Sequence, residues 1–315
     1  MTRRAAFVLT LLFSIGCDTS GTLDASMRDA SDHRDAGRFN AGTTDAGTAD
    51  GGLDAGASDA GHDAGSADAG GSDAGPPCSA FETVASPPDA PPFTGTAFIT
   101  DDFLTDADPS SFIDLTYTGQ GVRTMFDRRP AAFIELNAHL FDARFGGAVT
   151  VEIQVNPEFT RDQAETEARF YAAAIGRIPA FLFRDIDTVW IHAGMEAFGG
   201  GNRNLLIHTE RGESHVARGS LEEIFLHEAS HTSMDAYHKS DPRWLDAQAA
   251  DGVALSTYAR DNPTREDVAE TVGPYLAARF GGSRISAERR AAILDTVPNR
   301  VRYLDCLGLT MDLVP

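Results

Sequence analysis

The segment SLEEIFLHEASHTSMDAY, residues 220–237, is the most informative part of the sequence. Ser220 and Glu223 have the capping-box spacing, in which each side chain bonds the other residue's backbone at a helix start. Apolar residues 224–226 follow, and they can bury one side of a helix. The segment therefore predicts a helix from Ser220 to about Tyr237.

This predicted helix contains an HExxH motif, His227-Glu228-Ala229-Ser230-His231. Residues four apart share one face of a helix, so both imidazoles can point at one ion. Imidazole nitrogen is a common zinc ligand, and Glu228 lies one residue along, within reach of a water on the ion. The motif predicts a Zn²⁺ site with His227 and His231 as ligands and Glu228 as the general base.

A catalytic zinc site needs a third protein ligand and one open position. Four downstream residues are candidates: Asp235, His238, Glu266 and Glu270. A straight helix cannot wrap three turns around one ion, so we expect Asp235 to orient a ligand or to cap the structure below the site. His238 reaches the ion only if the helix breaks. Glu266 and Glu270 lie four apart in a second predicted helix, so one can bind metal while the other accepts an imidazole N–H.

An HExxH helix followed by a later helix with ExxxE resembles the gluzincin metallopeptidases. More narrowly, Tyr258, Arg260, Asn262 and the sequence EDVAE at residues 266–270 resemble the active-site helix of anthrax-lethal-factor-like peptidases. The resemblance covers residues 227–270 of the 315, and this chain has one extra residue between Asn262 and the EDVAE sequence.

The resemblance implies a role for each residue that matches. The metal ligands are His227, His231 and Glu266; the general base is Glu228; the oxyanion-stabilising residue is Tyr258; and Glu270 and Asp235 support the ligands from behind.

The remaining sequence predicts strands first and helices last, which is typical of an α+β fold. Residues 149–155, 188–193 and 204–209 predict strands, and residues 199–202 predict a turn. A helix is predicted over residues 160–175 with Thr160 as its cap, and the chain after Pro242 predicts helices.

The resemblance also implies a zincin-like fold: a small mixed sheet whose edge strand lies over the HExxH helix, followed by a mostly helical C-terminal part. In zincins a substrate peptide pairs with this edge strand. We assign the edge strand to residues 204–209, NLLIHT, which precede His227 by 17 residues. His208 on this strand either faces the cleft or packs in the core.

The chain begins with the features of a bacterial export signal. Arg3 and Arg4 precede an apolar run over residues 5–15, which is too short to cross a bilayer and suits a signal peptide. The run ends in Ser14-Ile15-Gly16-Cys17, which resembles the lipobox of bacterial lipoproteins with Ser14 in place of the usual leucine. This resemblance implies a signal peptide over residues 1–16 and lipid attachment at Cys17. The protein is then anchored to a membrane of the cell envelope, periplasmic or at the cell surface, whereas cleavage without lipidation releases it.

Residues 17–77 predict a disordered tether. From residue 18 onward they contain 12 Asp, 12 Gly, three Arg and one aromatic residue, Phe39, and the triplet Asp-Ala-Gly occurs seven times. Such a segment cannot bury enough apolar surface to offset the entropy of ordering its backbone. The triplets do not match calcium-binding loops, so we expect a solvated spacer.

Residues 78–315 are the predicted zinc metallopeptidase domain. Cys78 and Cys306 lie near its two ends, and they are the only cysteines left once Cys17 is lipidated. In an oxidising compartment the two can form a disulfide; the alternative is two buried thiols.

The charge of the chain excludes one class of partner. A net charge of −21 argues against nucleic acid, because phosphate binding needs a basic surface. The expected substrate is a peptide or protein. Two alternatives are a non-catalytic surface lipoprotein on a peptidase-like fold and a zinc hydrolase of peptidoglycan. Glu228 favours an enzyme, since a non-catalytic fold has no use for a base beside the metal.

Overall fold

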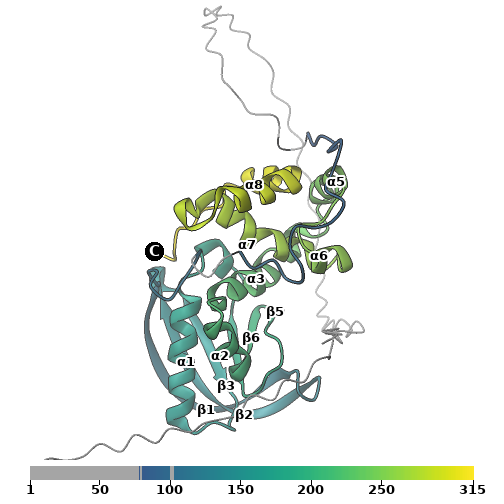
Figure 1. Ribbon diagram of the computed structural model, residues 1–315. Coiled ribbons are helices and arrows are strands. Elements are labelled where there is room, and N and C mark those ends of the chain that lie inside the picture. The colour runs from purple at the N-terminus through teal and green to yellow at the C-terminus, as the bar shows by residue number, and fades with distance from the viewer. Residues whose placement is uncertain (1–77, 79, 100–102) are drawn as a thin grey trace, which may run out of the picture. The chain divides into compact units, whose positions relative to one another are not determined.

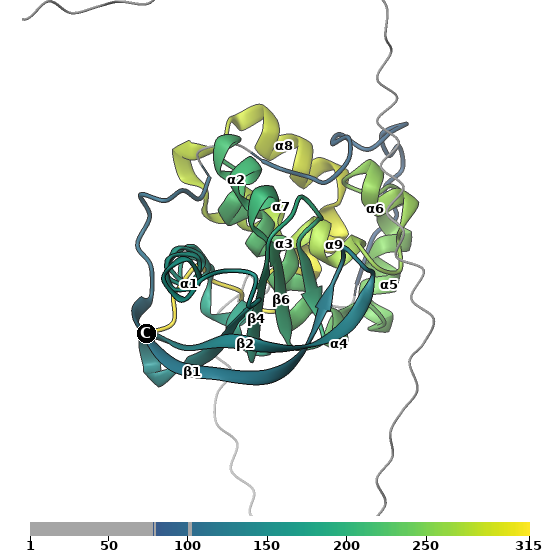
Figure 2. The ribbon, with the colours of Figure 1, turned by 90° about the horizontal axis from the view of Figure 1, so that it is seen from below.

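Six strands form one mixed sheet in the order β1-β2-β3-β4-β6-β5 (Figures 1 and 2). The computed structural model describes Cys78, residues 80–99 and residues 103–315, all of which belong to one compact unit. Strands β3, β4 and β6 run parallel, and the other three pairs are antiparallel. The strands are β1 (Phe112–Asp127), β2 (Ala132–Phe145), β3 (Thr150–Val155), β4 (Thr188–His192), β5 (Gly199–Gly201) and β6 (Asn204–His208).

Helices cover the sheet and then form the C-terminal half. Figure 1 shows α1 against the sheet and α3 between the sheet and α7. Within the described residues the α-helices are α1 (Arg161–Ile175), α2 (Thr209–Ala217), α3 (Leu221–Ser233), α4 (Asp235–His238), α5 (Pro242–Asp251), α6 (Thr257–Asp261), α7 (Asp267–Phe280), α8 (Ala287–Thr296) and α9 (Pro298–Asp305). Short 3₁₀ turns are η1 (Gly146–Ala148), η2 (Ala180–Phe183) and η3 (Gly282–Arg284).

The α+β prediction is confirmed, because strands dominate the first half of the described chain and helices the second. The three predicted strands match β3, β4 and β6. Thr160 caps α1 through a reciprocal bond pair with Gln163, as predicted for its start. The long β1–β2 hairpin was not predicted; its strands pair over nearly their whole length at the far edge of the sheet.

The helix predicted over residues 220–237 is in fact two helices. α3 ends at Ser233 and α4 begins at Asp235, with Met234 between them. The hydroxyls of Thr232 and Ser233 bond to carbonyls of Asn204 and Leu182, at 2.9 and 2.6 Å, which fixes the end of α3 against its neighbours.

The predicted capping box at the start of α3 is wrong. The Ser220 hydroxyl lies 3.0 Å from His215 Nδ1 instead of bonding the helix backbone. The Glu223 carboxylate accepts the backbone N–H of Ile99 at 2.6 Å. Tertiary partners therefore replace the local ones, as burial of both side chains permits.

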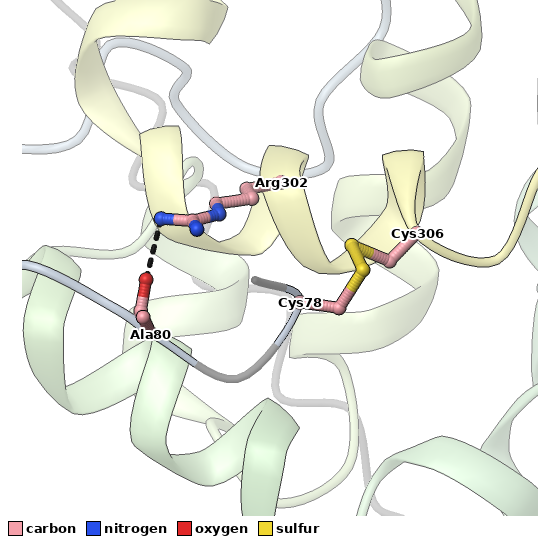
Figure 3. The surroundings of a disulfide bond; sticks show 4 residues. All are labelled: Cys78, Ala80, Arg302 and Cys306. Carbon is pink, nitrogen blue, oxygen red and sulfur yellow. Dashed lines mark hydrogen bonds between the residues drawn. A yellow bond between two sulfur atoms is a disulfide. The ribbon is translucent and has the colours of Figure 1, made fainter. Parts of the chain in front are cut away.

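The N-terminal segment of the described chain is tied to the last helix by a disulfide. Cys78 and Cys306 are joined, with 5.8 Å between their Cα atoms, and the Arg302 side chain donates to the Ala80 carbonyl nearby (Figure 3). The bond closes a loop of 228 residues, so it restricts the unfolded chain strongly. Further along, residue Phe93 forms a parallel bridge with Ser256.

The predicted signal peptide, the lipid-bearing Cys17 and the tether of residues 17–77 lie outside the described residues. Among the residues that the structure does describe, none of the helices combines the length and the apolar composition that a bilayer span requires.

Two buried histidines outside the HExxH motif, His192 and His215, predict acid sensitivity. Burial lowers the pKa of His192 to about 4, although Asp127 opposes the shift, and burial also lowers the pKa of His215 to about 4. Both are neutral in the folded protein at pH 7, but an unfolded histidine takes up a proton below about pH 6.5. The unfolded state therefore binds more protons between pH 6.5 and 4, and stability falls as pH decreases through this window.

Urea unfolding from pH 7.5 to 4 measures this effect. The denaturation midpoint of the wild-type chain should decline below pH 6.5, and His215→Gln should decline less steeply because it removes one of the histidines whose pKa burial lowers. Equal slopes for wild type and His215→Gln would contradict the assignment of His215.

Candidate metal centre

Helix α3 presents both histidines of the HExxH motif to one point. Every residue of α3 except His231 is buried, so the helix is held on all sides by the core. The Nε2 atoms of His227 and His231 face each other at 3.2 Å. The two imidazoles thus converge as their spacing of one helical turn predicts.

Glu266 completes a three-ligand group from the start of α7. Its Oε2 atom lies 3.0 Å from His231 Nε2 and 3.6 Å from His227 Nε2. In the described part of the chain these three residues are the one set of histidine, cysteine and acidic side chains close enough to share a metal ion.

The donor set fits a zinc ion. Ligand atoms about 2.0–2.1 Å from a tetrahedral ion lie about 3.3 Å from one another, and the three separations here bracket that value. Two imidazole nitrogens and one carboxylate oxygen also leave the fourth position for water or substrate, as catalytic zinc sites do.

The outer nitrogen of each imidazole faces a carboxylate. His231 Nδ1 lies 3.0 Å from Asp235 Oδ2, and His227 Nδ1 lies 3.4 Å from Glu270 Oε1. A carboxylate behind Nδ1 holds the proton on that atom and leaves the Nε2 lone pair for the ion. The structure thus brings Asp235 and Glu270 to the positions expected for residues that support the ligands.

The carboxylates around the two imidazoles favour the protonated form of both. Burial lowers the pKa of His231, but hydrogen bonds to Asp235 and Glu266 outweigh burial and raise that pKa to about 10. Burial also lowers the pKa of His227, but the interaction with Glu266 opposes burial, and the net effect is a raised pKa. Burial favours the protonated form of Glu266, yet the two histidines hold its pKa well below the usual range. A divalent ion binding here would displace protons from the imidazoles.

Glu228 and Tyr258 flank the three ligands. Glu228 is buried on α3 and its charge acts on both His227 and His231. The Tyr258 hydroxyl, from α6, donates to Glu266 Oε1 at 3.2 Å. The structure therefore gathers the predicted base and the predicted oxyanion residue around the predicted ligands.

The strand beside the HExxH helix is β5, and the prediction that residues 204–209 form the edge strand is wrong. β6 pairs with β4 on one side and β5 on the other, so it is interior. β5 lies at the edge, and a Cβ on Gly200 would meet the Glu228 carbonyl oxygen at 1.9 Å. Only glycine allows this close contact between the edge strand and the helix that carries the base.

Two histidines near the site serve other partners. His208 is fully buried on β6, and its Nε2 lies 3.4 Å from Asp127 Oδ1, so it packs in the core and does not face a cleft. His238 Nδ1 lies 2.7 Å from the Tyr303 hydroxyl, which removes His238 from the set of candidate ligands.

Sequence reasoning missed the N-terminal segment that supports the site. The backbone N–H of Ala97 donates to Glu270 Oε2 at 2.8 Å, while Thr257, at the start of α6, donates its N–H to the Phe93 carbonyl at 2.9 Å. Main-chain donors leave no residue-type signal, so no motif could have revealed them. Arg265 was also missed, although a cation next to a predicted ligand is visible in the sequence; its Nη2 lies 3.1 Å from Glu266 Oε1.

No protein family, no curated protein and no solved structure matches the chain.

The two glutamates of α7 should differ in their effect on metal affinity. Glu266→Ala removes a ligand atom and should abolish tight zinc binding. Glu270→Ala removes support for His227 and should weaken binding by about 10–100-fold. Competition with a coloured chelator measures both, and Glu213→Ala, an exposed position on α2, is the control. If Glu270→Ala loses the metal and Glu266→Ala keeps it, the two roles are reversed.

Proposed function

We propose that the chain is a zinc-dependent endopeptidase of gluzincin type with a zincin-like fold. The observation that carries this proposal is the convergence of His227 Nε2, His231 Nε2 and Glu266 Oε2 within 3.0–3.6 Å, with Glu228 on the same helix as the two histidines and its charge acting on both imidazoles. A three-ligand centre with an adjacent unligated carboxylate is the arrangement that metal-assisted hydrolysis needs.

Zinc bound by these residues would lower the pKa of a water and polarise the carbonyl of a peptide bond. Glu228 accepts the proton of the attacking water and returns it to the leaving amine. Tyr258 donates its hydroxyl to the oxyanion that develops on the substrate carbonyl. Asp235, hydrogen-bonded to the outer nitrogen of His231, and Glu270, whose Oε1 lies 3.4 Å from the outer nitrogen of His227, would orient the two imidazoles.

The substrate strand in this proposal is β5. It is the edge of the sheet, it runs antiparallel to β6, and its middle residue touches the backbone of Glu228. An extended peptide that adds to this edge by main-chain pairing would pass the base and the ligands. This placement supports hydrolysis of a polypeptide rather than of a small molecule.

Zinc content and peptide cleavage test the function. Purified full-length chain should hold one equivalent of zinc, cleave peptides in a library at internal bonds, lose activity with a chelator and regain it with zinc. Zinc binding without cleavage of any peptide would favour the non-catalytic surface lipoprotein. Release of cross-linked fragments from peptidoglycan, with no cleavage of peptides in the library, would favour the cell-wall hydrolase.

We also propose that the protein is exported and anchored through a lipid on Cys17, followed by the acidic tether. The apolar run before Cys17 supports an export signal, and the disulfide between Cys78 and Cys306 suits an oxidising compartment. Mass spectrometry of the N-terminal peptide from cells tests this anchor. Diacylglycerol on Cys17 is expected, and a free thiol at that residue would contradict it.

A further inference from the structure

The two oxygens of the Glu266 carboxylate face different partners. Oε2 points to the imidazoles, 3.0 Å from His231 Nε2. Oε1 receives two donors, the Tyr258 hydroxyl at 3.2 Å and the Arg265 guanidinium at 3.1 Å. The carboxylate is thus oriented so that only one oxygen is directed at the candidate metal position.

The two donors differ in how firmly the chain places them. Tyr258 belongs to α6, a separate short helix, and reaches Glu266 across the loop between α6 and α7. Arg265 is the residue next to Glu266, and its side chain is 45% exposed while that of Glu266 is 6% exposed. Arg265 can therefore adjust with Glu266, since the guanidinium carries several donors in a planar fork.

In the proposed function, the Tyr258 hydroxyl donates to two different acceptors at different stages. Its single O–H bonds Glu266 Oε1 in the structure, and the same O–H is the donor for the substrate oxyanion during hydrolysis. When Tyr258 turns to the substrate, Oε1 loses one of its two donors. A buried carboxylate oxygen without a donor is costly, and a carboxylate free to rotate is a poorer ligand.

We infer that Arg265 is a positioning residue that holds Glu266 Oε1 while the Tyr258 hydroxyl moves to the substrate. This inference rests on the proposed function for the movement of Tyr258. The shared hold on Glu266, meaning the two hydrogen bonds that Tyr258 and Arg265 donate to Oε1, is present in the structure without substrate. Either donor alone keeps Oε1 in place, and the ligand oxygen Oε2 keeps its direction.

Zinc affinity in a double-mutant cycle tests the shared hold. Tyr258→Phe and Arg265→Gln should each change the zinc dissociation constant little, because the other donor remains. The double variant should bind zinc about 10–100-fold more weakly, the loss typical when support behind a ligand is removed. Tyr258→Phe combined with Arg265→Lys should recover most of this loss, because lysine keeps a charged donor. Arg260→Gln on α6 is the matched control, since Arg260 is 53% exposed and pairs with Asp261.

Kinetics separate positioning from general stability. Arg265→Gln should lower kcat with little change in KM, because the Tyr258 hydroxyl is then the one donor left on Glu266 Oε1 and is less available to the substrate. The melting temperature of Arg265→Gln should equal that of Arg260→Gln. Additive effects on zinc affinity, whether both small or both large, would overturn the inference. Absence of zinc from the wild-type chain would instead refute the proposed function, so the two failures are distinguishable.

Discussion

Glu228→Gln will abolish peptide hydrolysis while the protein keeps its zinc. Glutamine matches the size of glutamate but cannot accept a proton from water, so the variant loses the general base. Such a loss lowers kcat by about 10²–10⁴-fold. The candidate ligand atoms belong to His227, His231 and Glu266, so their convergence does not depend on the charge of Glu228. Cleavage of a quenched fluorescent peptide and zinc stoichiometry are measured on the same sample.

Glu213→Gln provides the control for this change. Glu213 is an exposed glutamate on α2, and the same substitution there should leave both zinc and kcat unaltered. An active Glu228→Gln variant would show that another group takes the proton and would remove the base from the proposed mechanism. If the variant is inactive and has also lost its zinc, the loss of zinc explains the loss of activity.

Arg300→Ala will destabilise the domain strongly. The Arg300 side chain is 2% exposed and bridges two buried carboxylates. Its Nε lies 2.8 Å from Asp267 Oδ2, and its Nη1 lies 3.1 Å from Asp251 Oδ2. Burial raises the pKa of both aspartates, and the Arg300 charge opposes that rise. Removing the cation leaves both carboxylates buried without it, which costs about 3–5 kcal/mol. Thermal unfolding measures the loss.

The same variant should also weaken zinc binding, because Asp267 adjoins the ligand Glu266 at the start of α7. Arg279→Ala is the matched control. Arg279 also joins α7 to α9, through Asp305, but this pair is more than a third exposed, and such pairs contribute about 0–1 kcal/mol. Similar melting temperatures for the two variants would mean that Arg300 and its two buried aspartates contribute no more stability than a surface pair.

The part of the site that follows helical spacing was predictable from sequence. His227 with His231, and Glu266 with Glu270, lie four residues apart, and the structure brings both pairs to one centre. The distance between α3 and α7 was not predictable, since it depends on how the core packs. Asp235 was expected behind a ligand, but the break at Met234 that begins a new helix there was not expected.

The sheet was predicted less well, for a physical reason. Residues 204–208 have the composition of a strand, but composition does not distinguish an interior strand from an edge strand. Residues 199–201 are all glycine, which disfavours strands, so they predicted a turn. Pairing with β6 and the close contact with α3 outweigh that local preference. Only Asn202 and Arg203, both with positive φ, form the turn itself.

The three glycines of β5 also limit how this strand could distinguish one bound polypeptide sequence from another. A Cβ at Gly200 has no room, and one at Gly199 would press on Arg128 and Leu206 at 3.1 and 3.4 Å. β5 therefore presents no side chain to a chain lying along it, and of its peptide groups the Gly201 N–H already donates to the Thr232 hydroxyl at 2.8 Å. In the proposed function such an edge is indifferent to residue type, so discrimination among targets would depend on other parts of the site or on which proteins expose an unfolded stretch.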